Sequence, residues 1–374
     1  MEVPQGQFTL HRFPRRQREQ LRAWDAADEY LLREVSAQPD SLEIANTLVV
    51  NDSFGALATA LAAHNPQLWS DSYLSQQATI ANLKANGTDP DSVTLLNSLQ
   101  QPTGPLQLVL IKVPKTLALL EDQLMRLRPL LTTETSVRVA AMVKALPRSV
   151  WPLLERLVGP TDTALSWKKA KLIRVTPDLS LTLSPNPYPV MYQLENTDWE
   201  ISNHANVFSR DSLDIGTRFF LQHLPSTSGA QDIVDLGCGN GLLGLHAAER
   251  HPEATVHFVD ESFMAVASAQ ENMSRIFGES RKAAFHVGDG LEGFSAGSCD
   301  LVLCNPPFHQ QHALSDQTAQ RMFRQAHQVL RPGGELWVIG NRHLGYHRDL
   351  KKRFGTAEVI ASNAKFVVLS ARRT

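Results

Sequence analysis

A glycine-rich turn near residue 240 carries the clearest chemical pattern in this sequence. It follows a short apolar stretch, precedes a helical one, and contains Gly237, Gly239, Gly241 and Gly244. Glycine lets the backbone turn tightly and lets a ligand approach the main chain, and the amides at a helix N-terminus attract that ligand. The last three glycines also satisfy a dinucleotide fingerprint, with Asp260 where a ribose-binding acid would lie. The turn therefore predicts a nucleotide-cofactor site.

An aspartate just before the turn indicates which cofactor that is. Asp235 lies at the end of the expected strand, where its carboxylate could receive the amino group of a ligand, directly or through water. A dinucleotide site would instead keep this approach open for a pyrophosphate. S-adenosylmethionine carries an amino group, so the sequence favours it over NAD.

A second turn, Asn305-Pro-Pro-Phe308, directly follows the apolar strand at 301–304. Two prolines fix the backbone and remove two N–H donors, which leaves the Asn305 side-chain oxygen and the Pro306 carbonyl as acceptors. Such a site suits an exocyclic amine, which offers two N–H groups, and Phe308 can stack on its ring. Methyl transfer from a sulfonium then needs positioning more than a strong base. We expect Asn305, Pro306, Pro307 and Phe308 to be the catalytic residues.

Strand–helix alternation in both halves of the chain positions these turns. The first half predicts helices at 21–35, 56–63 and 117–130, and strands at 47–50, 108–113 and 137–143. The second half predicts helices at 242–250, 264–273 and 318–330, and strands at 233–236, 256–259, 284–287, 300–304, 335–339 and 366–370. This alternation predicts an α/β fold with parallel sheets and crossover helices. Prolines at 177, 185, 187 and 189 place the boundary between domains 1–190 and 191–374.

The two halves repeat each other. Residues 108–114 align with 301–307, and residues 70–73 align with 259–262. A repeat of this length predicts two copies of one domain. The first copy has only one glycine at 51–55 and has Lys112-Val-Pro-Lys115 where the second has the asparagine turn.

The asparagine turn resembles the Asn-Pro-Pro-Phe/Tyr turn of amino-methyltransferases, in which these residues bind the target amine. Residues 203–210 and 305–312 resemble the bacterial ribosomal RNA guanine-N2 methyltransferases, and residues 23–32, 111–120 and 363–369 resemble those that act on 23S RNA. The resemblance covers essentially the whole chain. It implies two tandem Rossmann-like class I methyltransferase domains, the N-terminal one degenerate, with S-adenosylmethionine as cofactor and a 23S guanine as substrate.

The resemblance also implies roles for individual residues. The glycine turn with Asp235 resembles the cofactor motif of class I methyltransferases, Asp260 the acid that binds both ribose hydroxyls, and Asp289 the residue that reads the adenine amino group. Phe208 belongs to a segment that covers the cofactor in such enzymes. The degenerate copy is then expected to bind RNA through the basic residues Lys112, Lys115, Lys168, Lys169, Lys171 and Arg174.

Composition limits the remaining possibilities. Lys and Arg total 36 against 38 Asp and Glu, so a nucleic-acid surface must be a local patch. The three cysteines form no metal or disulfide pattern, and His309 with His312 has no third ligand, so we expect no metal. The sequence shows no secretory signal and no apolar run near ~20 residues. We therefore expect a cytoplasmic protein that does not enter the membrane.

Several alternatives stay open from the residues alone. The target amine could be adenine N6, a small-subunit guanine or a protein glutamine. An NAD-dependent oxidoreductase would use the same glycine turn but leaves the asparagine turn unexplained. A non-enzymatic RNA-binding protein would predict that the second copy has decayed like the first.

Overall fold

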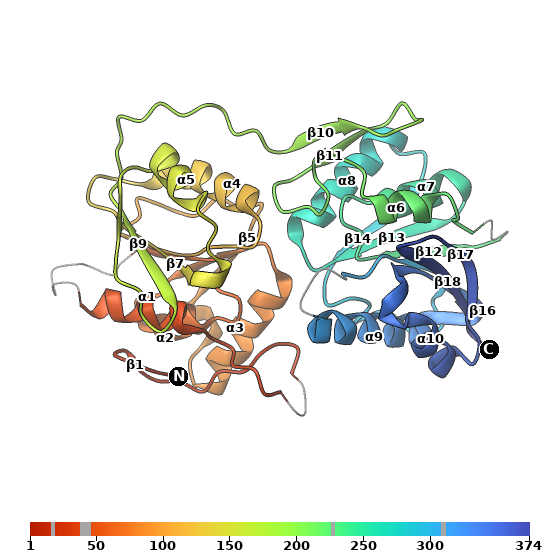
Figure 1. Ribbon diagram of the computed structural model, residues 1–374, viewed down its shortest axis with the longest axis horizontal. Helices are drawn as coiled ribbons and strands as arrows, with labels where there is room; N and C mark the ends of the chain where they lie inside the picture. Colours follow the sequence, from red (N-terminus) through yellow and green to blue (C-terminus); the bar gives the residue numbers. More distant parts are fainter. Residues whose placement is uncertain (16–18, 38–45, 226–228, 308–311) are drawn as a thin grey trace. The chain divides into compact units, whose positions relative to one another are not determined.

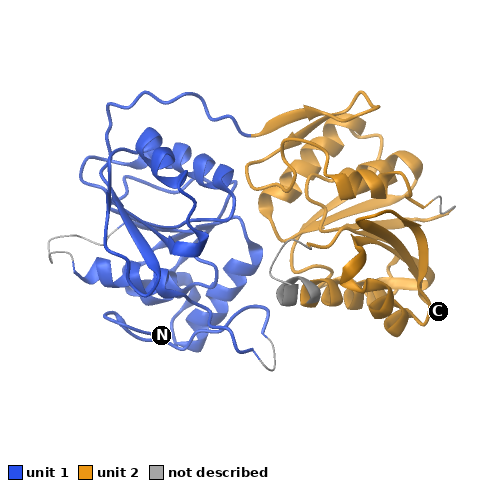
Figure 2. Ribbon diagram, in the orientation of Figure 1, with its two compact units in different colours: residues 1–188 blue, residues 189–374 orange. Residues whose placement is uncertain are grey.

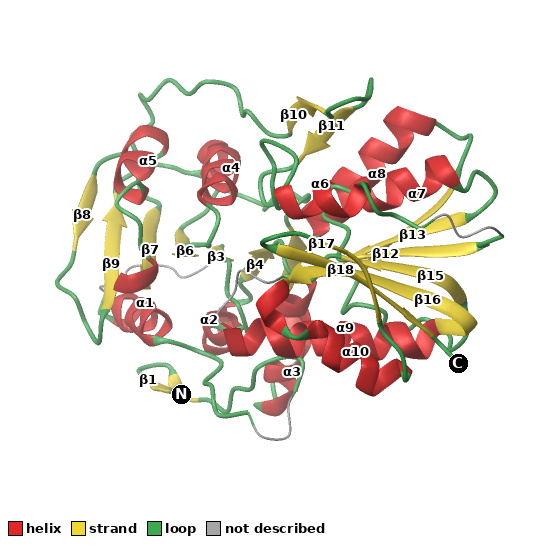
Figure 3. Cartoon of the chain, turned by 45° about the vertical axis from the view of Figure 1, so that its right-hand side comes forward, coloured by secondary structure: helices red, strands yellow, loops and turns green. Residues whose placement is uncertain are grey.

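The structure is a computed structural model that describes the chain except residues 16–18, 38–45, 226–228 and 308–311 and the side chains of 312–316. The described residues form two compact units, Met1–Tyr188 (unit 1) and Pro189–Thr374 (unit 2) (Figure 2). Each unit contains a mixed sheet of seven described strands between two layers of helices (Figures 1 and 3).

Unit 1 opens with a short hairpin and continues as an alternating α/β domain. Its strands are β1 (Glu2–Val3), β2 (Gly6–Gln7), β3 (Thr47–Val50), β4 (Gln67–Ser70), β5 (Thr94–Asn97), β6 (Leu108–Lys112), β7 (Ser136–Met142), β8 (Thr161–Thr163) and β9 (Ala170–Val175). Its α-helices are α1 (Ala26–Ser36), α2 (Ala56–Ala60), α3 (Tyr73–Ala85), α4 (Leu117–Leu127) and α5 (Val150–Leu157).

Unit 2 repeats this order after its own hairpin. Its strands are β10 (Val190–Gln193), β11 (Glu200–Asn203), β12 (Asp232–Leu236), β13 (Thr255–Asp260), β14 (Lys282–Val287), β15 (Cys299–Cys304), β16 (Leu330–Asn341), β17 (Glu358–Ser362) and β18 (Phe366–Arg372). Its α-helices are α6 (Ile215–Leu221), α7 (Leu242–Arg250), α8 (Phe263–Phe277), α9 (His312–Val329) and α10 (Tyr346–Phe354).

Both sheets have the same topology. The order is β5-β4-β3-β6-β7-β9-β8 in unit 1 and β14-β13-β12-β15-β16-β18-β17 in unit 2. The first five strands of each order are parallel, whereas β9, β8, β18 and β17 pair antiparallel. The expectation of parallel sheets therefore fails at one edge, because each unit ends in an antiparallel hairpin, whose strands need no crossover helix. Strand order reverses between β12 and β15, which is where open α/β sheets bind ligands.

Apolar cores cover both faces of each sheet. In unit 2, helices α6, α7 and α8 pack on one face around Phe258 and Ile233, and α9 and α10 pack on the other around Phe323 and Val338 (Figure 3). In unit 1, α1, α2 and α3 cover one face, and α4 and α5 cover the other. Because five strands of each sheet are parallel, their carboxyl ends lie at one edge of that sheet.

The strand registers correct one predicted alignment between the units. Val50 pairs with Trp69 in unit 1, and Leu236 pairs with Val259 in unit 2. The following helices are capped by the side chains of Ser72 and Ser262, at matching positions. Ser70 therefore corresponds to Asp260, one residue away from the predicted match with Asp71. Unit 1 thus has a serine where unit 2 has the predicted ribose-binding acid.

Helix α1 begins later than predicted, at Ala26 rather than near Leu21. Asp25 and Asp28 form a capping box: the Asp25 side chain accepts from the Ala27 amide at 2.8 Å, and the Asp28 side chain accepts from the Asp25 amide at 2.8 Å. This reciprocal pair satisfies amides that a helix leaves open at its first turn, and so fixes the start of α1.

Candidate active site

The glycine turn connects β12 to α7, and its glycines have different structural roles. Gly237, Gly239 and Gly241 have φ of +74°, +54° and +88°, which side chains other than glycine rarely adopt. A Cβ at Gly241 would lie 3.0 Å from the Cβ of Ala269, and one at Gly244 would lie 2.3 Å from the Phe258 ring. A Cβ at Gly239 would meet no atom of the described residues within 4 Å. The later glycines therefore allow close packing, whereas no described residue crowds Gly239.

Asp235 is a buried carboxyl group with one unused oxygen. It is 1% exposed, its Oδ2 accepts from the Gly244 amide at 2.8 Å, and its Oδ1 has no partner among the described residues. Burial raises the pKa of Asp235 to about 8. A buried acceptor without a partner costs free energy until a donor reaches it. Asp235 therefore fits a ligand that brings an N–H group.

Asp260 holds the turn and the next helix together. Its Oδ2 accepts from the Gly239 amide at 3.1 Å, and its Oδ1 accepts from the Ser262 amide at 3.0 Å. Asp260 lies at the carboxyl end of β13, beside the glycine turn, which is where the sequence predicts a ribose contact. The contact itself stays a prediction, and the carboxylate has a structural duty in addition.

Asp289 forms an ion pair with Arg321 that the sequence did not predict. It is 4% exposed, and both its carboxylate oxygens pair with the guanidinium of Arg321 on α9. Its backbone carbonyl accepts from Gln325 at 3.0 Å. This pair fixes where the carboxylate lies, and the predicted adenine contact of Asp289 stays a prediction. No local spacing signals a partner in the following helix.

The Asn305 side chain has one satisfied end and one open end. Its Nδ2 donates to Thr217 Oγ1 at 3.1 Å, while its Oδ1 is buried without a partner among the described residues. Pro306 is buried and Pro307 is exposed, while Phe308 lies outside the described residues. A Cβ at Gly237 would lie 4.0 Å from the Asn305 carbonyl oxygen, so the two turns are neighbours. The structure therefore brings two orphan acceptors, Asp235 Oδ1 and Asn305 Oδ1, to adjacent strand ends.

The segment before α6 packs onto α8. The His204 amide donates to Ser268 Oγ at 3.0 Å, and its ring Nε2 lies 2.8 Å from Glu271 Oε1. Phe208 follows and is 56% exposed. The predicted cofactor contact of Phe208 stays a prediction, and its exposure shows that it is not an ordinary core residue.

The two cysteines inside the motifs are poor nucleophiles. Cys238 and Cys304 are buried, and burial raises the pKa of both thiols. A thiol that stays protonated neither attacks nor binds metal. Among the described residues, no three His, Cys, Asp or Glu side chains group as metal ligands would. His309 lies outside the described residues, as does the side chain of His312.

Lys112 occupies in unit 1 the place that Asn305 occupies in unit 2. Its side chain is 13% exposed, and its ammonium group lies 2.8 Å from Asp25 and 2.7 Å from Asp28. Although burial opposes it, the two carboxylates raise the pKa of Lys112, which therefore stays charged. These internal partners argue against the predicted RNA contact at Lys112.

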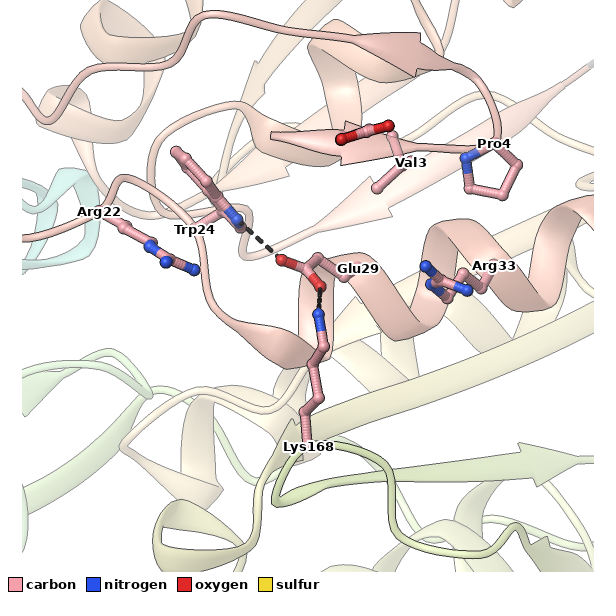
Figure 4. A pocket seen from close by; sticks show the side chains of 8 residues that line it. Val3, Pro4, Arg22, Trp24, Glu29, Arg33 and Lys168 are labelled. Carbon is pink, nitrogen blue, oxygen red and sulfur yellow. Dashed lines mark hydrogen bonds and ion pairs between the residues drawn. The ribbon is translucent and has the colours of Figure 1, made fainter.

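The other predicted RNA contacts differ in how exposed they are. Arg174 pairs with Glu34 at 2.6 Å and with Asp162 at 3.0 Å. Lys115 and Lys169 are exposed, Lys171 is half-buried, and none of the three has an ion-pair partner among the described residues. Lys168 pairs with Glu29 at 2.8 Å and lines a cavity of about 670 Å³ together with Arg22, Trp24 and Arg33 (Figure 4).

Within the described part of the chain, no helix is both long and apolar enough to cross a bilayer.

Two family models match the sequence. Residues 1–179 match the RLMG N-terminal domain, and residues 198–370 match the methyltransferase small domain. Each match lies within one of the two units.

Full-length relatives share about half of the residues. The chain is 52% identical to the ribosomal RNA large subunit methyltransferase G of Streptomyces avermitilis, over 99% of this chain and 98% of the relative. It is 48% identical to that of Aeromonas hydrophila, again over 99% and 98%. A T. thermophilus 16S rRNA N2 methyltransferase (RsmC), solved with AdoMet and guanosine, matches the fold with a TM-score of 0.75 at 20% identity, covering 94% of this chain and 92% of that one. The chain therefore belongs to the family of ribosomal RNA large subunit methyltransferases G.

Proposed function

We propose that this protein transfers a methyl group from S-adenosylmethionine to the N2 amine of a guanine in 23S ribosomal RNA. Membership in the large-subunit methyltransferase family supports the reaction and the type of RNA. The observation that carries the site assignment is a pair of buried acceptors without a partner among the described residues, Asp235 Oδ1 and Asn305 Oδ1, at the ends of neighbouring strands.

The residues of the glycine turn fit S-adenosylmethionine. Asp235 Oδ1 would accept from the amino group of its methionine part, and Gly239, which no described residue crowds, would admit the ligand to the main chain. Asp260, at the end of the neighbouring strand, would accept from the ribose hydroxyls. When bound, the cofactor supplies an electrophilic methyl group on a sulfonium.

Asn305 would orient the amine. Its Oδ1 accepts one N–H of the guanine amine, and the Pro306 carbonyl accepts the other. Gripping both hydrogens directs the nitrogen lone pair away from the ring and toward the methyl group, which is a positioning effect. The guanine must leave its stack to reach this buried atom, as nucleobases modified by enzymes commonly do.

We assign the RNA contacts of unit 1 to its exposed cations. Lys115 and Lys169 carry charges that no described carboxylate neutralises, so they can attract phosphates. Lys171 is a weaker candidate because it is half-buried, and Lys112 and Arg174 are held by internal carboxylates.

Asn305→Ala tests the site. We expect S-adenosylmethionine affinity to stay within about twofold, while methyl transfer falls by more than roughly 100-fold, because positioning supplies the rate. Calorimetry measures the first, and transfer of labelled methyl to rRNA from cells lacking the protein measures the second. Retained turnover would remove Asn305 from the chemistry.

Mass spectrometry of nucleosides from the same cells tests the substrate. Loss of N2-methylguanosine from 23S RNA is the expected result. Loss of N6-methyladenosine, or of a modification in 16S RNA, would overturn the substrate assignment while leaving the methyltransferase reaction intact.

A further inference from the structure

We propose that Thr217 and Asp214, at the first turn of α6, are positioning residues that hold the Asn305 amide in the orientation needed to accept from the substrate amine. This inference rests on the proposed role of Asn305. It assigns a duty to a helix whose residues entered none of the predicted sites.

A continuous chain of hydrogen bonds connects the three side chains. Asn305 Nδ2 donates to Thr217 Oγ1 at 3.1 Å, and Thr217 Oγ1 donates to Asp214 Oδ2 at 3.3 Å. Asp214 is the N-cap of α6, and the same Oδ2 accepts from the Thr217 amide at 2.8 Å. Thr217 is 9% exposed, so water has little access to its hydroxyl.

The direction of this chain fixes which end of the amide is open. The oxygen and NH2 ends of an asparagine have nearly the same shape, so their hydrogen-bond partners decide the orientation. A carboxylate accepts, so the Thr217 hydroxyl donates its hydrogen bond to Asp214 Oδ2. The hydroxyl oxygen is then left to accept from Asn305. The NH2 group must therefore face Thr217. Oδ1 then points away from Thr217, to where it has no partner among the described residues.

The first turn of α6 is held firmly against the sheet. A Cβ at Gly216 would lie 3.0 Å from Asp214 Oδ2 and 3.3 Å from the Phe366 ring of β18. A side chain at position 216 would therefore force these neighbours to shift. The Thr217 hydroxyl is therefore supported by the same sheet that carries Asn305 at the end of β15.

Unit 1 contains the same arrangement with different chemistry. Helix α1 also starts with an aspartate cap, Asp25, and its third residue is Asp28, as Thr217 is the third residue of α6. Both aspartates accept hydrogen bonds from Lys112, which is the residue that corresponds to Asn305. The repeat has thus kept a contact between a helix start and a strand end. In unit 1 this contact neutralises a cation, and in unit 2 it orients an amide.

Thr217→Val tests the inference, because valine keeps the shape and leaves the backbone cap bond to Asp214. We expect kcat to fall roughly 10- to 100-fold, the cost of a misplaced reacting group, with cofactor affinity and Tm unchanged. Thr217→Ser restores the hydroxyl and should recover most of kcat. Thr255→Val is the matched control, because Thr255 begins β13 at the opposite end of the strands.

The outcomes separate this inference from the proposed function. If Asn305→Ala abolishes transfer but Thr217→Val does not lower kcat, Asn305 acts without Thr217 and the inference fails alone. If Thr217→Ser stays as slow as Thr217→Val, or if Thr217→Val lowers Tm or cofactor affinity in proportion to activity, Thr217 is a packing residue. If Asn305→Ala retains turnover, the proposed function of the site fails as well.

Discussion

The two units have the same topology but differ in the residues at the point where the strand order of the sheet reverses. In unit 2, Asp235 and Asn305 each present a buried oxygen without a described partner. In unit 1, the first position is the apolar Val49, and the second is Lys112, paired with two aspartates. Unit 1 supplies partners from inside the chain, whereas unit 2 leaves acceptors for a ligand. The difference shows how a binding site can be closed without changing the fold.

The helix that follows the first turn makes the same point. Both α2 and α7 begin at a glycine in the left-handed region, Gly55 and Gly241. In unit 1 the Asp52 carboxylate accepts from the amides of Ala56, Leu57 and Ala58 at 3.0, 2.8 and 3.0 Å. An internal anion thus takes the place where an anionic ligand could bind. The corresponding residue of unit 2 is Cys238, which leaves the α7 amides to other partners.

The largest effect is expected when the internal partner of unit 1 is removed. Lys112→Met leaves Asp25 and Asp28 without their cation, so we expect unit 1 to lose about 3–5 kcal/mol of stability at pH 7.5. Methyl transfer by the folded protein should change little, because the Lys112 ammonium group is already paired with Asp25 and Asp28. Denaturant unfolding at two pH values measures the loss.

The pH dependence of this loss follows from Asp28. Burial raises its pKa from 3.8 to about 6 even beside Lys112, so the native state binds a proton that the unfolded state lacks between these values. Stability from this group is therefore lost as pH rises through that window. Without Lys112 the pKa rises further, so the variant should be least destabilised near pH 5. Adding Asp28→Asn should recover part of the loss, and equal destabilisation at both pH values would contradict the buried pair.

Asp235→Asn tests the open acceptor of unit 2. The variant replaces one acceptor by an NH2 group, so the hydrogen bond to a charged amino group is lost, worth about 1.5–3 kcal/mol. We expect S-adenosylmethionine affinity to fall roughly 10- to 100-fold. Calorimetry measures this, with the exposed Asp198→Asn as control. Unchanged affinity would show that the ligand does not reach Asp235.

Without ligand, the Asp235→Asn variant should also differ from the wild type in how its stability depends on pH. The pKa of Asp235 is raised from 3.8 to about 8, so the native state again binds the extra proton and stability falls as pH rises through this window. Asparagine removes this titration. As pH rises from 5 to 8, we expect the Tm of the variant to increase relative to the Tm of the wild type.

Local patterns in the sequence were enough to predict the elements next to the site. Strand β3 at Thr47–Val50 and helix α7 at Leu242–Arg250 lie as predicted, because an apolar run and a helical repeat are bounded by turn residues. The sequence predicts Lys171 and Arg174 as RNA contacts, but both lie on strand β9, whose buried positions belong to the sheet. The cations of β9 obscured the apolar residues between them.

Contacts between distant residues could not be predicted in this way. The Asn305 turn was evident from four consecutive residues, but its partner Thr217 lies 88 positions earlier. The guanidinium on Asp289 comes from a helix 32 positions later. Neither pair has a local spacing, because each depends on how a helix packs across strand ends. Sequence reasoning therefore found the chemical groups and missed those that orient or neutralise them.

The smallest effect is expected from the exposed cations of unit 1. Lys115→Gln together with Lys169→Gln should weaken binding to 23S RNA several-fold at 0.15 M salt, and each lost phosphate contact should lower the salt slope of binding by about 1. Lys84→Gln, an exposed cation on α3, is the matched control. Since the Lys112 ammonium group is paired with two carboxylates, Lys112→Met should leave the salt slope unchanged, which separates a phosphate-binding lysine from a structural one. If the salt slope fell for Lys112→Met and not for the double variant, RNA would contact Lys112 and not the two exposed lysines.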